Sequence, residues 1–135
     1  MNLFADIEPA LMMGITVSRQ WKNGIELCAP LENNRNDKGT GFAGSISSIL
    51  TLAGWALMTR ALHEAGIQAE VMVVKSETEF TAPVTGDFMA ACETTDAETA
   101  RVFQELETRG RSRIRLDAEI PGCARMTASY AVIAI

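Results

Sequence analysis

The fold is decided by the stretch at positions 33–45, which reads Asn33-Asn34-Arg35-Asn36-Asp37-Lys38-Gly39-Thr40-Gly41-Phe42-Ala43-Gly44-Ser45. It is a polar loop that leads into an apolar segment, and no residue from Phe42 to Thr59 is charged. A helix that is apolar on nearly every face has to be surrounded, and in a chain of 135 residues only a sheet is large enough to surround it. We therefore expect one long helix that begins near Phe42, ends before Gly66 and is wrapped by a sheet.

The start of this helix is the first candidate site. The first turn of a helix carries backbone N–H groups without intrahelical partners, together with the positive end of the helix dipole. Here these groups would lie near Gly44 and Ser45, next to the polar loop. They could polarise a carbonyl group or hold an anion.

Composition limits the other possibilities. Hydrophobic residues make up 47% and charged residues 21% of the chain, which is typical of a packed globule, and we expect one domain over residues 1–135. The net charge of -5 argues against nucleic-acid binding. The segment 42–59 is interrupted by Gly, Ser and Thr and is too polar for a membrane span. The first residues do not resemble a signal peptide, so we expect a cytoplasmic protein.

No metal site or disulfide is predicted. The cysteines Cys28, Cys92 and Cys123 are far apart, and none is near a histidine with ligand spacing. We expect them to be small core residues.

The remaining elements follow from hydrophobic periodicity. Residues 14–21 and 25–31 alternate around an Asn23-Gly24 turn and predict a β-hairpin. In the long strand over 69–80, strict alternation would place one set of side chains on one face and a second set on the other. The first set is Met72, Val74, Ser76, Thr78 and Phe80, and the second is Val71, Val73, Lys75, Glu77 and Glu79. The other predicted elements are a helix over 2–12 bent near Pro9, a strand over 88–93, a helix over 96–107 capped by Thr95 or Asp96, and strands over 111–119 and 124–135.

This layout resembles the hotdog fold, an α+β architecture in which a curved antiparallel sheet is wrapped around one long central helix. The run Asn34-x-Asn36-x-x-Gly39-Thr40-x-Phe42-Ala43-Gly44-Ser45, with Leu52-Ala53-Gly54-Trp55-Ala56 after it, is similar to the thioesterase-like domain found as the C-terminal half of YiiD-type proteins. It more distantly resembles the acyl-CoA thioesterases of the phenylacetate-pathway type. The segment 79–87 is similar to a strand end of many hotdog thioesterases. The resemblance covers essentially the whole chain.

The resemblance implies a thioester hydrolase that acts on acyl-CoA or an acyl-carrier protein, needs no cofactor, and forms a homodimer or a dimer of dimers. In the phenylacetate-type enzymes a His stands at the position of Phe42, and an Asp or Glu stands at the position of Thr51. The carboxylate that serves there as base or nucleophile is therefore absent from this position. The reaction class can be argued from the sequence, but the base stays unassigned.

The candidate residues fall into two groups. The catalytic candidates are Asn36, Gly44, Ser45, Ser48 and Thr51. The substrate-binding candidates are Gly39, Thr40, Phe42, Lys75, Arg113 and Arg115.

Each candidate also has a structural interpretation. Asn36 could place a water molecule or could set the turn geometry of its loop. Ser48 and Thr51 could line the site or could bond back to the helix carbonyl four residues earlier. Lys75 could meet a phosphate or form a cross-strand ion pair. The single histidine, His63, is interpreted as a surface or capping residue near the helix end.

Arginine is concentrated in the last third of the chain. Half of the 12 Lys and Arg residues are Arg101, Arg109, Arg111, Arg113, Arg115 and Arg125. Guanidinium groups suit nucleotide phosphates, although a solvated strand face balanced by Asp117 and Glu119 would give the same pattern.

Two other functions remain open at this stage. The missing carboxylate is compatible with a protein that binds acyl-CoA or acyl-carrier protein without catalysis. A hotdog dehydratase is a third alternative, but that chemistry usually relies on a His with an Asp or Glu, and no histidine lies near the loop.

Overall fold

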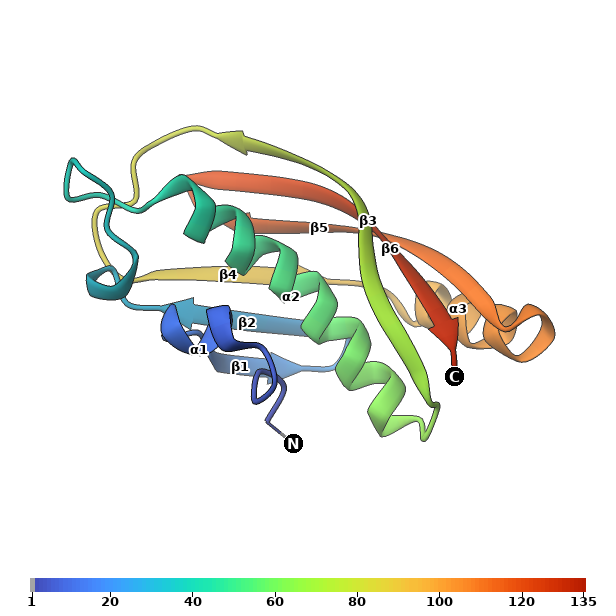
Figure 1. The fold of residues 1–135 in the computed structure, drawn as a ribbon. Coiled ribbons are helices and arrows are strands. Elements are labelled where there is room, and N and C mark those ends of the chain that lie inside the picture. Colours follow the sequence, from blue (N-terminus) through green and yellow to red (C-terminus); the bar gives the residue numbers. More distant parts are fainter. Residues whose placement is uncertain (1) are drawn as a thin grey trace.

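The long helix is present as α2, Ala43–Glu64, at the centre of the fold (Figure 1). The computed structural model describes residues 2–135. The helix ends at Ala65, and Gly66 follows with a φ of +71°, as expected for a residue just after a helix end. Along its length Ile49, Leu50 and Ala53 are fully buried. The prediction of an enclosed helix is therefore confirmed.

A six-stranded antiparallel sheet encloses α2 in the order β1-β2-β4-β5-β6-β3. Figure 1 shows the sheet curving around one side of the helix. The strands are β1 (Thr16–Trp21), β2 (Gly24–Ala29), β3 (Ala69–Phe80), β4 (Phe88–Glu93), β5 (Arg111–Ile120) and β6 (Ala124–Ala134). The other elements are α1 (Glu8–Met12), the 3₁₀ helix η1 (Glu32–Asn34) and α3 (Asp96–Arg109). The α+β class and the curved antiparallel sheet were predicted correctly.

The leading helix is shorter than predicted. It begins at Glu8 instead of residue 2, and Pro9 lies in its first turn, where the missing N–H has no helical partner to lose. Pro9 therefore starts this helix and does not bend it. Upstream, the ring of Phe4 packs against Trp55 of α2 at 6.3 Å between centroids, so the N-terminal turns cover one side of the central helix.

Strand β3 differs from the strict alternation expected from its sequence. Val73 pairs with Tyr130 and Lys75 pairs with Ser129, so Val74 is an extra residue at a bulge. Paired residues point to the same face, and Tyr130 faces α2. Val71, Val73, Ser76, Thr78 and Phe80 therefore share the inner face, and the expected separation of Val71 and Val73 from Ser76, Thr78 and Phe80 was wrong.

Helix α3 covers an open edge of strand β5. Strand β4 pairs with β5 only at Ala91↔Glu119 and Cys92↔Ala118, which leaves the first half of β5 without a strand on that side. Arg101 of α3 fills part of this gap by donating a hydrogen bond of 2.9 Å to the main-chain oxygen of Arg113. Thr95, one of the two predicted N-cap residues, accepts from the Glu98 amide at 3.1 Å.

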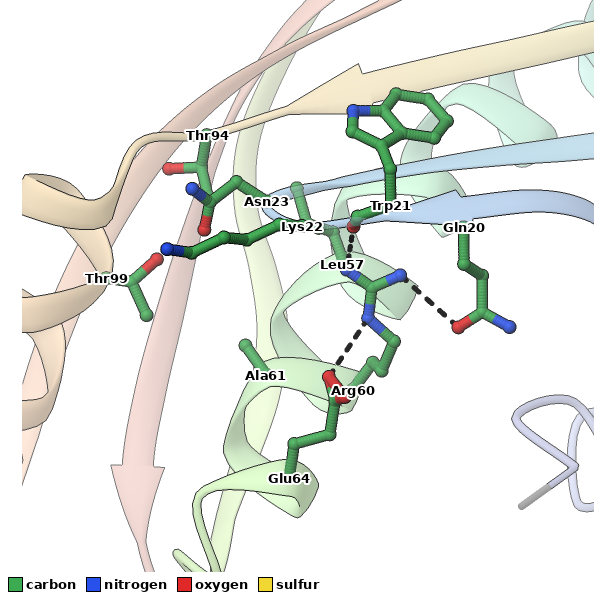
Figure 2. Close-up of a pocket in the computed structure, with 10 residues that line it drawn as sticks. All are labelled: Gln20, Trp21, Lys22, Asn23, Leu57, Arg60, Ala61, Glu64, Thr94 and Thr99. Atoms are coloured by element: carbon green, nitrogen blue, oxygen red, sulfur yellow. Dashed lines mark hydrogen bonds and ion pairs between the residues drawn. The ribbon is translucent and has the colours of Figure 1, made fainter.

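At its C-terminal end α2 is fastened to the β1–β2 hairpin by Arg60 (Figure 2). The guanidinium donates to the main-chain oxygens of Gly24 (2.9 Å) and Trp21 (3.0 Å) and to Gln20 Oε1 (3.2 Å). Its Nε lies 3.3 Å from Glu64 without hydrogen-bond geometry. Arg60, Trp21 and Gln20 line a hollow of about 390 Å³. The guanidinium of Arg60 in its wall is already bonded to the β1–β2 hairpin, so it serves to hold the helix against the sheet.

By length and composition α2 could cross a membrane. In the structure, however, 56% of its most apolar window is buried inside the fold. The apolar character of the helix is explained by this burial, as the sequence predicted.

Gly54 offers a test of how closely the sheet fits the helix. A Cβ at this position would stand 2.3 Å from the hydroxyl oxygen of Tyr130, which is buried and donates to the Thr51 carbonyl at 2.7 Å. We expect Gly54→Ala to lower the free energy of unfolding by about 1–3 kcal/mol through overpacking, measured by denaturant titration.

Removing the Tyr130 hydroxyl should relieve part of this clash. In a double-mutant cycle, Gly54→Ala combined with Tyr130→Phe should therefore cost less than the sum of the single changes. Simple additivity would show that the hydroxyl is not the group that excludes a side chain at position 54.

Candidate functional site

The loop before α2 is shaped by the side chain of Asn36. Its Oδ1 accepts from the amides of Lys38 (2.9 Å) and Thr40 (3.0 Å), and its Nδ2 donates to Thr40 Oγ1 (2.9 Å) and to the Gly41 carbonyl (3.3 Å). Gly39 completes the turn with a φ of +79°. Asn36 is thus engaged in turn geometry, and its water-placing role stays a prediction.

The two motif segments identified in the sequence meet at the start of α2. Gly41 donates its amide to the carbonyl of Val84 at 2.8 Å, and a Cβ on Gly41 would stand 2.8 Å from Val84 Cβ. The buried Asn34 anchors the other side of the loop by donating to the carbonyls of Met13 and Pro30, each at 2.8 Å. The loop is therefore held from two directions.

The first turn of α2 has no side-chain cap. Phe42 is the N-cap residue, with φ -67° and ψ 130°, and no acidic residue occurs in the first turn. The first helical bond runs from the Ile46 amide to the Phe42 carbonyl at 3.0 Å. Within residues 2–135, the amides of Ala43, Gly44 and Ser45 have no backbone or side-chain acceptor. These three N–H groups are therefore unpaired within these residues; Ala43 and Gly44 are exposed, whereas Ser45 is only 7% exposed.

Phe42 forms a wall beside these donors. A Cβ on Gly44 would stand 2.5 Å from ring carbon Cε2 of Phe42, so the ring lies directly against the Gly44 backbone. Phe42 is 53% exposed. Its ring places an apolar surface next to the free amides.

The helix hydroxyls bond to their own helix. Ser48 Oγ donates to the Gly44 carbonyl and Thr51 Oγ1 donates to the Ser47 carbonyl, each at 2.8 Å. Thr51 Oγ1 also lies 3.5 Å from Met126 Sδ. The structure therefore shows the back-bonded arrangement for both residues, and their catalytic role stays a prediction.

The basic candidates lie elsewhere in the chain. Ile114 and Leu116 of β5 are buried, whereas Arg113 and Arg115, which alternate with them, are exposed on the outer face of the sheet. Lys75 lies on the same outer face, where its register partner is Ser129 and not an acid. Within one chain, the structure does not bring these three residues to the loop.

No obvious base is found near the helix start. In the described part of the chain the buried polar residues are Asn34, Ser45 and Ser112, and none is a carboxylate. His63 is exposed in the last turn of α2, at the opposite end of the helix. Burial, with smaller effects of Asp117 and Glu93, raises the pKa of the Cys92 thiol to about 12, so Cys92 is a core residue as expected. Cys28 and Cys123 are only partly buried, so the prediction that all three cysteines are core residues was wrong for these two.

The comparison with protein families decides the identity of the fold. A family model described as "Putative thioesterase (yiiD_Cterm)" matches residues 5–132. The chain belongs to this family. The resemblance seen in the loop and in the central helix is thereby confirmed.

Solved structures agree with this assignment. A protein of unknown function from Chlorobaculum tepidum TLS superposes with a TM-score of 0.94 and 28% identity, over 98% of this chain and 90% of that chain. A structure described as a putative thioesterase from Shewanella oneidensis gives a TM-score of 0.85 and 23% identity over 96% and 90% of the two chains. A thioesterase from Haemophilus influenzae gives 0.73 and 15% over 98% and 87%. The hotdog fold is confirmed.

Two residues of this site were missed by the sequence reasoning. Asn34 was quoted in the loop motif and Val84 lies in the quoted segment 79–87, but neither was named as a candidate, although both position the start of α2. The sequence signal for each was the resemblance of its segment to related proteins. The long-range contacts of Asn34 leave no local pattern beyond that motif.

The loop geometry predicts a structural cost for Asn36→Ala. Removing the side chain deletes the contacts to Lys38, Thr40 and Gly41, so we expect a loss of about 1–3 kcal/mol in the free energy of unfolding and faster hydrogen exchange at the Thr40 amide. Asn33→Ala is the matched control, because exposed Asn33 makes one bond to the Met12 carbonyl (3.2 Å) outside this turn. Equal effects of the two changes would contradict the role given to Asn36.

Proposed function

We propose that this protein hydrolyses acyl thioesters of coenzyme A or of an acyl-carrier protein, with the thioester carbonyl bound at the start of α2. The observation that carries the proposal is the uncapped first turn, where the Gly44 and Ser45 amides have no acceptor within residues 2–135. Membership of the thioesterase family supports this class of reaction. Family membership does not distinguish coenzyme A from an acyl-carrier protein, so the identity of the carrier belongs to the proposal.

The chemistry follows from what these donors can do. The thioester oxygen accepts from the two amides, and the negative charge that develops on it when water adds to the carbonyl carbon is stabilised there. The C–S bond then breaks, the thiol leaves with a proton, and a carboxylic acid is released. The aromatic ring of Phe42 would cover the carbonyl, with Gly39 and Thr40 of the loop on the other side.

A non-catalytic acyl-CoA or acyl-carrier-protein binder is the second candidate. It is favoured by Thr51, which stands where related enzymes have a carboxylate, and by the lack of a buried carboxylate in the described residues. A panel of acyl-CoAs of different chain lengths, followed by thiol release and by calorimetry, separates the two. Tight binding without thiol release would establish the binder.

We further propose a cytoplasmic homodimer, or a dimer of dimers, in which the edge of β3 pairs with a second copy. Strand β3 ends the sheet, and its neighbouring Met72, Val73 and Val74 are 43%, 43% and 45% exposed. An exposed, apolar strand edge favours pairing with another strand.

The proposed oxyanion site predicts the effect of Ser45→Pro. Proline removes one of the two proposed donors at a position where that N–H has no helical acceptor, although Gly44 before it is helical and Ser45 is buried, so some loss of stability is expected. Because the interaction strengthens in the transition state, we expect kcat to fall about 10²–10³-fold in variant protein that circular dichroism shows to be folded.

Ala43→Pro is the matched control for this experiment. Its N–H is also free of helical bonding, and Phe42 has the extended ψ of 130° that suits the residue before proline. Activity should remain within a few-fold of the unmodified protein. Normal turnover in a folded Ser45→Pro protein would place the oxyanion site elsewhere.

The dimer proposal predicts the size of the particle in solution. Sedimentation at micromolar concentration should give an assembly of two or four 14.6 kDa chains. Val74→Lys, at the exposed bulge residue of β3, should shift it toward the monomer, because a charge on the β3 edge opposes strand pairing. Thr16→Lys on β1, at the other sheet edge, is the control and should leave the assembly intact. A single chain in the unmodified protein would contradict the proposal.

A further inference from the structure

A groove between α3 and the start of β5 is lined by four of the nine arginines of this chain. We call it the arginine groove, and its lining includes Arg101, Glu105, Arg109, Arg111, Arg113 and Ile133. Its volume is about 520 Å³, within the range of about 300–1,000 Å³ that is usual for small-molecule sites. The whole protein has a net charge of -5, so this concentration of positive charge is local.

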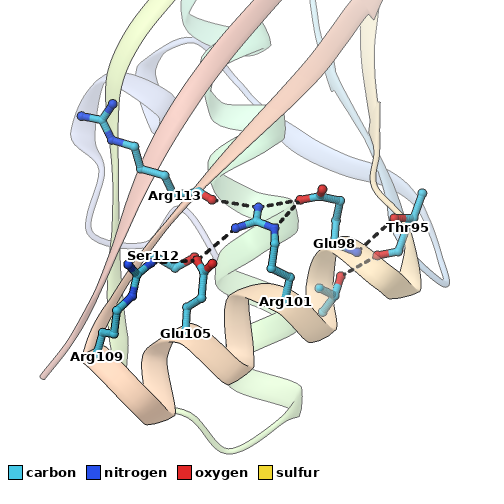
Figure 3. A network of polar contacts seen from close by, with 8 residues as sticks. Thr95, Glu98, Arg101, Glu105, Arg109, Ser112 and Arg113 are labelled. Atoms are coloured by element: carbon cyan, nitrogen blue, oxygen red, sulfur yellow. Dashed lines mark hydrogen bonds and ion pairs between the residues drawn. The ribbon is translucent and has the colours of Figure 1, made fainter.

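Two arginines of the lining, Arg101 and Arg109, are already in ion pairs with its one acid, Glu105, the second of them at 3.5 Å (Figure 3). Arg101 contacts Glu98 at 2.6 Å and Glu105 at 3.0 Å. Glu105 also accepts from Ser112 Oγ at 2.6 Å, and this bond, with Arg101 and Arg109 nearby, holds the pKa of the Glu105 carboxyl below its usual value. Glu105 is therefore anionic, and its Oε1 makes the contacts to Arg101, Arg109 and Ser112, whereas it forms no ion pair with Arg111 or Arg113.

Arg111 and Arg113 have no acid opposite them. In the β5–β6 register they face Ile133 and Ala131, and neither takes part in any ion pair found within residues 2–135. Figure 3 shows the guanidinium of Arg113 extending away from the acids of α3. Arg125, at the other end of the same sheet face, instead contacts Glu79 at 3.0 Å and is in register with Glu119.

Within the described residues, the positive charges of Arg111 and Arg113 are therefore not paired with a carboxylate, whereas the charge of Arg125 on the same face of the sheet is neutralised by Glu79. Like charges that neighbour one another on a strand repel, and small or apolar residues opposite them give no compensation. A bound anion with several oxygen atoms would remove that repulsion, and the planar guanidinium is suited to bidentate contact with phosphate.

We propose that the arginine groove binds a phosphorylated nucleotide. The phosphates contact Arg109, Arg111 and Arg113, and the base lies on the apolar surface of Ala131 and the 41% exposed Ile133. A concave groove of this size fits a small molecule better than it fits the surface of an acidic protein. The observations behind this site are independent of the helix start and of hydrolysis.

The nucleotide could come from two sources with the same chemistry. It could be the phosphorylated adenosine headgroup of an acyl-CoA, in which case the inference rests on the proposed function and names CoA as the acyl carrier. It could also be a free nucleotide that binds apart from the hydrolytic site. In the first case the adjacent Arg115, Ser129 and Lys75, which lie in one row on the outer face, would continue the positive surface toward the edge strand β3.

The binding test is calorimetry of the full chain with adenosine 3′,5′-bisphosphate. We expect Arg113→Ala, and separately Arg111→Ala, to weaken binding about tenfold or more, because each removes a charged hydrogen-bond donor. Arg113→Ala keeps the contact to Arg101, which uses the main-chain oxygen. The matched control is Arg125→Ala, which removes the same charge from the same face and should leave binding within about twofold.

Kinetic measurements then show whether the bound nucleotide is the headgroup of the acyl-CoA substrate or a free nucleotide. If the ligand is the substrate headgroup, Arg113→Ala should raise KM for an acyl-CoA but leave KM for the same acyl group on pantetheine unchanged. If the ligand is a free nucleotide, both KM values stay the same while the calorimetric loss remains. A protein without turnover would remove the proposed function, and the calorimetry would still decide on the groove.

Three results would overturn the inference. The first is no binding of the bisphosphate to the unmodified protein at millimolar concentration. The second is an equal loss in Arg113→Ala and Arg125→Ala, which would indicate nonspecific charge attraction. The third is binding of an acidic carrier protein through Arg113 while the nucleotide does not bind.

Discussion

The enclosure of α2 is the constraint on which the rest of the structure depends. A helix without charge from Phe42 to Thr59 cannot be left in water, and the sheet must curve to cover it. The fit is close enough that Tyr130 reaches the helix backbone, bonds the Thr51 carbonyl at 2.7 Å and leaves no room for a side chain at Gly54. The need to bury α2 against the sheet therefore explains both the curvature of the sheet and the small residue at position 54 of the helix.

The same constraint shapes the candidate site. An apolar helix has no Asp or Glu in its first turn, and an aromatic N-cap residue cannot accept a hydrogen bond from the helix amides. The polar residues that could have served as caps are used instead to hold the loop, with Asn36 closing the turn and Asn34 tying it to the preceding segments. The free amides of Gly44 and Ser45 are thus a consequence of how the core is built.

Local patterns predicted most of the fold, and long-range contacts account for what was missed. Hydrophobic alternation and the Asn23-Gly24 turn were sufficient for the hairpin, and the lack of charge was sufficient for α2. The bulge at Val74 was not predictable, because consecutive valines satisfy either face and only pairing with β6 decides between them. For the site, the sequence located the loop and the helix start. The sequence could not show whether the side-chain amide of Asn36 binds a ligand or closes its own turn, because asparagine is suited to both roles.

The contribution that a general base would make to hydrolysis can be compared, as a free energy, with that of the oxyanion donors. A single oxyanion donor contributes about 10²–10³-fold to kcat, and a positioned general base contributes about 10²–10⁴-fold. In the proposed hydrolase the free amides at the start of α2 would supply the first, whereas no buried carboxylate among the described residues is present to supply the second. A hydrolase and a binder built on this chain therefore differ by about 3–5 kcal/mol of transition-state stabilisation, which is the effect of one well-placed proton acceptor. Both proposals place the thioester carbonyl at the same free amides, so they differ in whether water is activated beside Phe42 and not in how the thioester is held.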